Sequence, residues 1–335
     1  YRTTQEMASN VFRKGYQWPF HASRMLDFGS SLVDLAVFRE GEKGRKVFMD
    51  FNRNPAPVPG DQPFDLARLD DDVRVYLSYA GASHAMPIDR LRHMNPLAIE
   101  LYRRYKIDIA GAPLEFAVNN QHMNGGIAVD VWGRSNIGGI YAVGEAAGTH
   151  GATRPGGSAL NAGQVFGTRV AEHVAASGRA VAPSAVPAGS ADAVSRTLSL
   201  AKSESALSVR AVRDELQARM SAHAGILCTA DGVRRALEAA RDLADRIRAE
   251  GIAPDRPSEL ARLVQWQQMA LASEAVLTAL DFYIAEGGGS RGARAVCDPS
   301  GEGLPETRTG ALENYRFRKE NPADMTGQIR VRLEG

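Results

Sequence analysis

The chain has 335 residues, a length that predicts two or three domains, with 44% hydrophobic and 24% charged residues as in ordinary globular proteins. Its 40 lysine and arginine residues nearly balance its 39 aspartate and glutamate residues, which argues against binding to nucleic acid or to an anionic membrane through a global positive field. No apolar run approaches the roughly 20 residues that a membrane helix needs, so no transmembrane segment is predicted.

The first part of the chain, residues 1–105, is mixed and irregular in pattern. The apolar run 31–38 predicts a helix, and residues 47–51 predict a short strand. The proline-rich stretch 54–60 predicts a rigid loop. The three aspartates at 70–72 fit a solvated helix start better than a metal site, because no carboxylate spacing of the loop-ligand type accompanies them.

Glycine becomes dense in residues 106–178, which predicts a different kind of structure. Two strands are expected at 126–130 and 139–144, with good turn residues between them. The second strand leads into a glycine-rich loop, 144–157, and a helix is expected to follow over 158–176.

One face of that helix carries only small residues, at every fourth position: Ala159, Gly163, Gly167 and Ala171. Each glycine inside a helix costs about 1 kcal/mol relative to alanine. The pattern therefore indicates that something approaches the helix backbone closely, and packing against a sheet and contact with a flat ligand explain it equally well.

The last part of the chain predicts a helical bundle. Residues 179–200 are rich in alanine, proline, glycine and serine, as in a linker. Apolar residues then recur at helical spacing over 209–220, 233–247 and 258–284, and nothing on these faces requires chemistry.

Several motifs are excluded. Residues 287–292 have the letters of GxGxxG, but a helix precedes them and no helix follows, so they predict a loop and not a dinucleotide site. Cys228 and Cys297 belong to no CxxC pair, which predicts a reduced intracellular protein without a disulfide or a metal site.

The stretch 144–160 holds the residues with the most evident chemistry. Glu145, expected at the tip of a buried parallel strand, is placed to accept hydrogen bonds from a ribose. Arg154 is a candidate clamp for a carboxylate, and a helix that begins at Ser158 directs its positive end at the loop. These features alone fit a nucleotide or anion site and a tight turn equally well.

Longer motifs in this region carry a resemblance to a known family. The run 139–145 (GIYAVGE), the run 150–154 (HGATR), Gly156, Gly157 and Leu160 resemble the second FAD-binding segment of the succinate dehydrogenase and fumarate reductase flavoproteins, a family that includes L-aspartate oxidases. Residues 121–127 (QHMNGGI), 220–225 and 290–293 match further family segments in the same order. The resemblance covers about residues 1 to 295.

The resemblance implies an α/β fold: part of an FAD-binding Rossmann-like domain with an α+β capping domain and a C-terminal helical bundle. The domains expected are the C-terminal part of the capping domain (1–105), the second FAD-binding segment (106–178), a linker (179–200), the helical domain (201–295) and a basic tail (296–335). The basic side chains of the tail are expected to be solvated, with docking on a partner subunit as the alternative. They are Arg316, Arg318, Lys319, Arg330 and Arg332.

The resemblance also assigns roles to individual residues. It implies that Glu145 binds the adenosine ribose of FAD, and that Arg154 holds a substrate carboxylate. The start of the following helix would lie against the isoalloxazine ring. The full set of expected cofactor-binding residues is Gly126, Gly144, Glu145, Gly157, Ser158, Ala159 and Leu160.

The chain departs from the family pattern at several positions. Gln121 stands where the family has a histidine, and His122 follows it, so either His122 takes over the hydrogen bond to substrate or the substrate is not a simple C4 dicarboxylate. Ala159 replaces a serine and Pro155 a leucine. Arg24 is a candidate for the proton-donating arginine of the capping domain, with an ordinary surface arginine as the alternative.

The function expected is FAD-dependent hydride transfer to or from a carbon–carbon bond beside the carboxylate of a small substrate. The family's N-terminal strand–GxGxxG–helix does not occur, so the sequence is expected to start inside the capping domain. The alternatives are a non-catalytic fragment, one half of a split flavoprotein, and a related oxidase or dehydrogenase. An electron-transfer subunit or a missing N-terminal half is the expected partner, and the location cytoplasmic or peripheral at a membrane through that partner.

Overall fold

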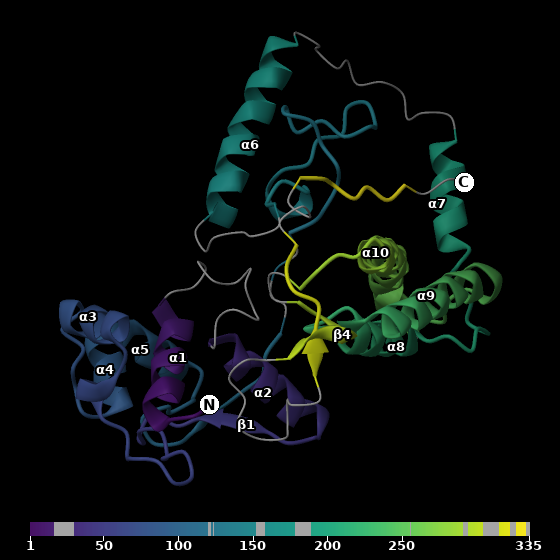
Figure 1. Cartoon of the computed structure of the whole chain (residues 1–335). Helices are drawn as coiled ribbons and strands as arrows, with labels where there is room; N and C mark the ends of the chain where they lie inside the picture. Colours follow the sequence, from purple (N-terminus) through teal and green to yellow (C-terminus); the bar gives the residue numbers. More distant parts are fainter. Residues whose placement is uncertain are drawn as a thin grey trace. The chain divides into compact units, whose positions relative to one another are not determined.

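The computed structural model describes residues 1–16, 30–119, 122, 124–151, 158–177, 189–254, 256–290, 294–303, 315–321 and 326–332 (Figure 1). The chain divides into two compact units. Unit 1 comprises residues 1–120, 291–293 and 299–317, and unit 2 comprises residues 121–290, 294–298 and 318–335. None of the helices in the described part of the chain combines the length and the hydropathy that a membrane span requires.

Unit 1 is built from short helices and one small strand pair. Its elements are α1 (Thr4–Tyr16), α2 (Ser30–Glu42), β1 (Val47–Met49), η1 (Leu66–Arg68), α3 (Asp71–Tyr79), α4 (Pro87–Met94), α5 (Pro96–Arg104), β2 (Leu114–Phe116) and β5 (Arg316–Phe317). Strand β1 pairs antiparallel with β2, with Phe48 opposite Glu115. The helix predicted over 31–38 is confirmed, and the strand predicted over 47–51 is confirmed for residues 47–49.

The aspartate run at 70–72 begins helix α3, as predicted. Nη2 of Arg13, on α1, lies 2.6 Å from Oδ2 of Asp70 and 2.7 Å from Oδ1 of Asp72. The hydrogen bond with Asp72 contributes most to raising the pKa of Arg13. The carboxylates therefore connect the start of α3 to α1. Their negative charge also interacts favourably with the positive end of the α3 helix dipole.

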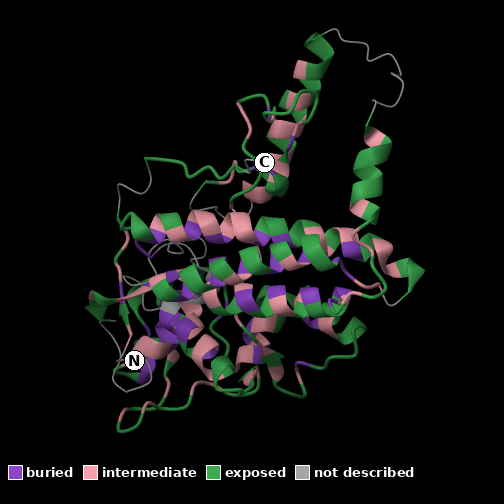
Figure 2. Ribbon diagram, turned by 90° about the vertical axis from the view of Figure 1, so that its right-hand side faces the viewer, coloured by how far each residue is buried: buried purple, intermediate pink, exposed green. Residues whose placement is uncertain are grey.

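The core of unit 2 is a bundle of α8 (Val209–His223), α9 (Ala230–Glu250) and α10 (Leu260–Ala285). Buried residues form a stripe along these helices (Figure 2). Ser208 and Thr229 cap α8 and α9 with side-chain oxygens, each 3.0 Å from a backbone nitrogen of the first turn. The bundle predicted from the periodicity is confirmed.

Unit 2 has further elements outside the bundle. Strand β3 (Leu227–Thr229) pairs in parallel with residues 295–297 of β4 (Ala295–Gly303). The other elements of unit 2 are η2 (Gly144–Ala146), α6 (Ser158–Ala176), α7 (Ser190–Leu198) and η3 (Pro257–Glu259). Helix α6 agrees with the predicted helix.

Helix α7 lies inside the stretch 179–200 whose composition predicts a linker, so the second half of that stretch is helical. Gly189, with a φ of +89°, precedes the helix. The negative charge of Asp192 in the first turn interacts favourably with the positive end of the helix dipole. Composition indicated a linker, but the residues 190–198 contain neither glycine nor proline and can form a helix.

Arg318 is not a solvated residue of the tail, which corrects the prediction for this side chain. Its Nη2 lies 2.8 Å from Oδ2 of Asp298, and its Nη1 donates to the carbonyl oxygen of Ile284 at 2.7 Å. Ile284 is in the last turn of α10, where carbonyls have no partner within the helix. Arg318 therefore caps α10 and joins it to β4.

The two strands predicted at 126–130 and 139–144 are not formed, so this prediction is wrong. The structure has only single bridges there, Ile127 with Ala147 and Arg134 with Tyr141. Positive φ angles at Gly139 (+84°) and Gly144 (+64°) interrupt the extended backbone. A parallel strand needs neighbours to satisfy its backbone groups, and the described residues offer only these isolated contacts.

Candidate functional site

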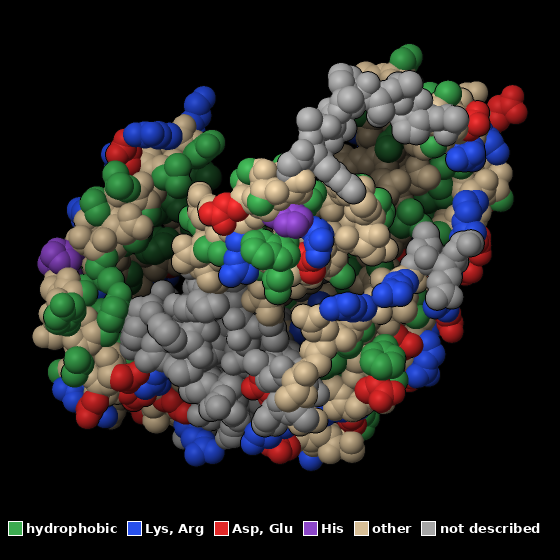
Figure 3. Space-filling view, turned by 90° about the horizontal axis from the view of Figure 1, so that it is seen from above, with side chains coloured by type: hydrophobic (Ala, Val, Ile, Leu, Met, Phe, Trp, Pro, Cys, Tyr) green, Lys and Arg blue, Asp and Glu red, His purple; other side chains and the backbone are tan. Residues whose placement is uncertain are grey.

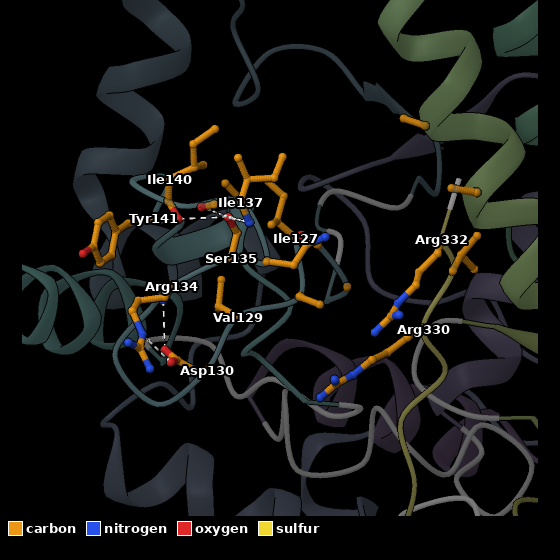
Figure 4. A pocket seen from close by; sticks show the side chains of 18 of the residues that line it. Ile127, Val129, Asp130, Arg134, Ser135, Ile137, Ile140, Tyr141, Arg330 and Arg332 are labelled. Carbon is orange, nitrogen blue, oxygen red and sulfur yellow. Dashed lines mark hydrogen bonds and ion pairs between the residues drawn. The ribbon is translucent and has the colours of Figure 1, made fainter. Parts of the chain in front are cut away.

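A cavity of about 1210 Å³ lies in unit 2 and contains two of the predicted cofactor residues, Gly126 and Glu145 (Figure 4). Binding pockets for small molecules typically measure about 300–1,000 Å³, so the cavity is large enough for an extended ligand. It is lined by residues 125–130, 134–141, 145–146 and 329–332 and by Ala272, Ala275, Val276 and Ala279 of α10.

Gly126 brings two backbone segments together at the edge of this cavity. A Cβ atom on Gly126 would lie 2.7 Å from the carbonyl oxygen of Ala146. Ile127 N–H donates to that same oxygen at 2.9 Å, and Gly148 N–H donates to the carbonyl of Ile127 at 3.0 Å. A side chain at position 126 would break this contact, so the glycine places the 146–148 backbone, and with it Glu145, at the cavity.

The small face of α6 receives the backbone of η2. A Cβ atom built on Gly144 would lie 3.7 Å from Cα of Gly163, and a Cβ atom on Gly167 would meet nothing within 4 Å. Of the two explanations that the sequence left open, close packing therefore applies at Gly163. Gly144 itself has a φ of +64°, which favours glycine.

Glu145, His122 and His150 form a connected polar group. Oε1 of Glu145 lies 3.0 Å from Nδ1 of His122, and Nε2 of His122 lies 2.7 Å from Nδ1 of His150. A carboxylate beside Nδ1 favours the tautomer in which that nitrogen carries the proton. In neutral His122, Nε2 then accepts a hydrogen bond from His150 Nδ1–H.

This arrangement constrains what His122 can do. Its side chain is 13% exposed, that of Glu145 is 55% exposed, and both ring nitrogens of His122 contact protein groups. A hydrogen bond from His122 to a substrate would require it to release Glu145 or His150. The sequence did not single out His150, although it stands in the same HGATR run as Arg154.

Other predicted site residues divide into two groups. Ser158 and Ala159 are half-buried at the start of α6, and Leu160 is 79% exposed. Arg24, Gln121, Arg154 and Gly157 lie outside the described residues, so their roles stay predictions.

Charged groups of both signs line the cavity. Nε of Arg134 donates to Oδ2 of Asp130 at 2.6 Å. Desolvation, the largest single effect, raises the pKa of Asp130, but hydrogen bonds from Arg134 and from Trp132 N–H outweigh it and lower that pKa. Arg330 and Arg332 also line the cavity, which the sequence did not predict because no motif includes them. On the face seen from above, positive and negative side chains are interspersed (Figure 3).

Comparison with known proteins connects this region to flavoproteins. A sequence family described as an FAD binding domain matches residues 38–160. One of the subunits of the fumarate reductase (CoM/CoB) from Methanothermobacter marburgensis is 47% identical over 64 residues, which are 19% of this chain and 12% of that protein. The L-aspartate oxidase of Bacillus subtilis is 30% identical over 190 residues, which cover 52% of this chain and 33% of that protein.

Solved structures show the same fold. A chain of E. coli quinol fumarate reductase superposes with a TM-score of 0.53 and 21% identity, covering 86% of this chain and 48% of that one. A second quinol-fumarate reductase gives a TM-score of 0.55 at 20% identity, with 90% and 49% covered. The chain thus spans about half the length of the solved chains that it matches. These matches confirm the resemblance that the sequence shows: the chain is similar to fumarate reductase flavoproteins and L-aspartate oxidases, and the FAD binding domain matched over residues 38–160 gives FAD as its cofactor.

Proposed function

We propose that the protein is an FAD-dependent oxidoreductase that transfers a hydride to or from a carbon–carbon bond beside a carboxylate. The observation that carries the proposal is the position of Gly126 and Glu145. Both fall in the segment that matches an FAD binding domain, and both line one large cavity. FAD supplies the hydride chemistry when it is bound, and the protein supplies binding, orientation and charge.

The residues of the chain fit this role in separate ways. Glu145, half-exposed at the cavity, would accept hydrogen bonds from ribose hydroxyls while His122, itself in contact with His150, holds its carboxylate in place. The positive end of α6, at Ser158, would favour negative charge beside it. The substrate carboxylate would be held by Arg154, with His122 or Gln121 assisting, and Arg24 would move the proton.

Substitution of Arg154 tests the proposal. In the enzyme reconstituted with FAD, Arg154→Ala is expected to lower turnover at least about a hundredfold, because positioning and charge stabilisation of the carboxylate are lost. Arg196→Ala, on the exposed face of α7, serves as the matched control and should leave turnover unchanged. Turnover of Arg154→Ala within a few-fold of wild type would contradict the proposal.

A second candidate is one half of a split flavoprotein, or a fragment that does not catalyse by itself. Exposed apolar side chains favour it: Ile140 is 48% exposed, Leu160 is 79% exposed, and no residue of α6 is buried. Visible absorption of the purified chain separates the two. Flavin bands near about 450 nm support a complete FAD site, and a colourless chain that gains them only with a partner supports the second candidate.

The electron partner and the location are part of the same proposal. An electron-transfer subunit would bind the chain, and the protein would be cytoplasmic or peripheral at a membrane through that subunit. Several related oxidases and reductases use different substrates, so the substrate proposed is a small carboxylate without further definition.

A further inference from the structure

Helix α5 of unit 1 (Figure 1) carries a stripe of apolar side chains that face solvent. Leu97, Leu101 and Tyr105 are spaced four residues apart, which places them on one face of the helix. They are 70%, 53% and 73% exposed. The opposite face packs into the core of unit 1 through Ile99 and Tyr102. The helix thus already buries one apolar face, and the α5 stripe is apolar surface beyond what that core uses.

Basic side chains accompany the stripe. Helix α5 and the two residues after it hold three basic side chains and one acid, a net charge of +2. The acid, Glu100, pairs with Arg104, so the charges of Arg103 and Lys106 are additional, and both side chains are exposed. Asp108 follows, but its Oδ1 accepts a backbone hydrogen bond of 3.1 Å within the next turn. Positive charge therefore lies beside the exposed leucines and tyrosine.

Lys106 stands in a conformation that suits glycine better. Its φ is +62°, which no other non-glycine residue in the described part of the chain shares among positive values. Lys106 N–H donates to the carbonyl of Arg103 at 2.9 Å and ends the helix, at a position where glycine is common. A strained lysine at such a position indicates a use for the side chain itself.

The kind of partner follows from charge and from area. Leucine and tyrosine side chains beside lysine and arginine suit the boundary between the headgroups and acyl chains of a bilayer, and anionic headgroups attract the basic residues. A stable protein interface buries about 800 Å² on each partner. A nine-residue helix is only about 14 Å long and about 10 Å wide, so α5 by itself offers far less. A lipid surface needs no such matched patch.

Helix α3 shows that exposed apolar side chains alone are not distinctive. Val75 and Tyr79 are also four residues apart, and they are 68% and 94% exposed. However, residues 70–80 contain three aspartates and one arginine, a net charge of −2. An anionic surface would repel α3 and attract α5, which makes α3 a matched control in the same unit.

We propose that the α5 stripe binds directly to an anionic lipid surface. Leu97, Leu101 and Tyr105 enter the headgroup region, and Arg103 and Lys106 lie at the lipid phosphates. Screening limits such attraction to about 10 Å at 0.1 M salt, so the local charge at α5 decides the contact and not the +1 of the whole chain. The contact requires neither FAD nor a partner subunit, and it is therefore independent of the proposed function.

Co-sedimentation of the full chain with lipid vesicles, with no other protein present, tests the proposal. The wild-type chain should bind vesicles of equimolar phosphatidylcholine and phosphatidylglycerol at least about tenfold more tightly than vesicles of phosphatidylcholine alone. The variant Arg103→Gln, Lys106→Gln should lose most of that difference, and added salt should weaken wild-type binding. The variant Leu97→Ser, Tyr105→Ser should bind the anionic vesicles at least about tenfold more weakly than wild type.

Two controls match these variants. Val75→Ser, Tyr79→Ser removes one aliphatic and one tyrosine side chain from α3, and it should leave vesicle binding unchanged. Arg235→Gln, Arg262→Gln removes two exposed charges from α9 and α10, and it should also leave binding unchanged. Equal loss of binding in a control and in its matched α5 variant would show a general effect of polarity or charge and would overturn the proposal.

Lys106→Gly separates lipid binding from a structural role of the lysine. Glycine relieves the strained conformation, so the midpoint of thermal unfolding should stay the same or rise. Binding to the anionic vesicles should nevertheless fall about fivefold, because one basic residue is lost. Unchanged vesicle binding in this variant would contradict the role given to the side chain, even if the leucine and tyrosine variant failed to fold.

Other occupants of the stripe would give different results. A wild-type chain that binds neither kind of vesicle overturns the proposal. If analytical ultracentrifugation then shows a wild-type dimer that is lost in Leu97→Ser, Tyr105→Ser, the stripe joins two copies of the chain. Equal affinity of the wild-type chain for neutral and anionic vesicles would also overturn it, because the basic residues would then contribute nothing.

Discussion

The bundle of α8, α9 and α10 and the segment 124–177 belong to the same unit but are stabilised differently. The bundle buries its own apolar side chains: Leu243, Leu263 and Leu277 are 0% exposed. In the segment, the apolar side chains of Ile140 and Leu160 are 48% and 79% exposed, and α6 has no buried residue. The bundle is complete from its own sequence, whereas the segment has apolar surface and cavity walls left for a ligand or a partner.

The largest difference between the two regions is expected when apolar side-chain volume is removed from each. Leu243→Ala in α9 should lower the free energy of unfolding by about 2–5 kcal/mol, because the side chain is fully buried and leaves a void. Leu160→Ala in α6 should change it by no more than about 0.5 kcal/mol, because Leu160 is 79% exposed. Urea denaturation of both variants measures the difference.

Equal losses in the two variants would contradict the comparison, since they would show that α6 is packed as firmly as the bundle. The free energies are comparable only if both variants keep the wild-type dependence on urea concentration, because a changed slope indicates a changed denatured state. Circular dichroism before denaturation checks that each variant is folded.

Bound FAD is expected to stabilise the segment 124–177 and to leave the bundle unchanged. A ligand at one hundred times its dissociation constant stabilises the state that binds it by up to about 2.7 kcal/mol. Amide exchange measured with and without FAD should therefore slow in residues 125–148, which line or border the cavity, and stay unchanged in α8 and α9. Slowing confined to the bundle would place the ligand elsewhere.

The same contrast explains which elements could be predicted from sequence. Helices α8, α9 and α10 follow from apolar residues three and four positions apart, and a helix satisfies its hydrogen bonds within that local stretch. The strands expected at 126–130 and 139–144 depend on neighbours far away in the chain, and the described residues supply only single bridges. Apolar, β-branched composition indicated strands without showing what they pair with.

In the candidate site too, local motifs could be recognised from the sequence, but contacts between distant residues could not. Motifs identified Gly126 and Glu145, and the structure brings both to one cavity. The contact of His122 with Glu145 and with His150 joins positions 23 and 28 residues apart, which spacing alone does not reveal. Arg330 and Arg332 reach the cavity from the other end of the chain, so no local pattern could assign them there.

A smaller loss of stability is expected when the contact of Arg318 with the end of α10 is removed. Arg318→Ala should lower the free energy of unfolding by about 1–3 kcal/mol, because Asp298 and the carbonyl of Ile284 lose a partly buried charged donor. Arg234→Ala is the control: its contact with Asp231 is 3.8 Å long and exposed, so the loss should stay below about 1 kcal/mol. Thermal unfolding of the two variants compares them, and equal midpoints would show that the tail does not support α10.

The smallest perturbation is chemical modification of Cys228, which reports whether the bundle opens. Its side chain is 1% exposed in the bundle core, and burial raises the pKa of its thiol, partly opposed by Arg294. A raised pKa leaves less of the reactive thiolate at pH 8. Iodoacetamide should therefore modify the Cys297→Ser variant, which retains Cys228, at least about tenfold more slowly than the Cys228→Ser variant, and its rate should keep rising above pH 9. Similar rates at pH 8 would mean that the bundle opens as readily as its surroundings.

Adding Leu243→Ala should speed modification of Cys228, because the cavity in the core lowers the free energy of that opening.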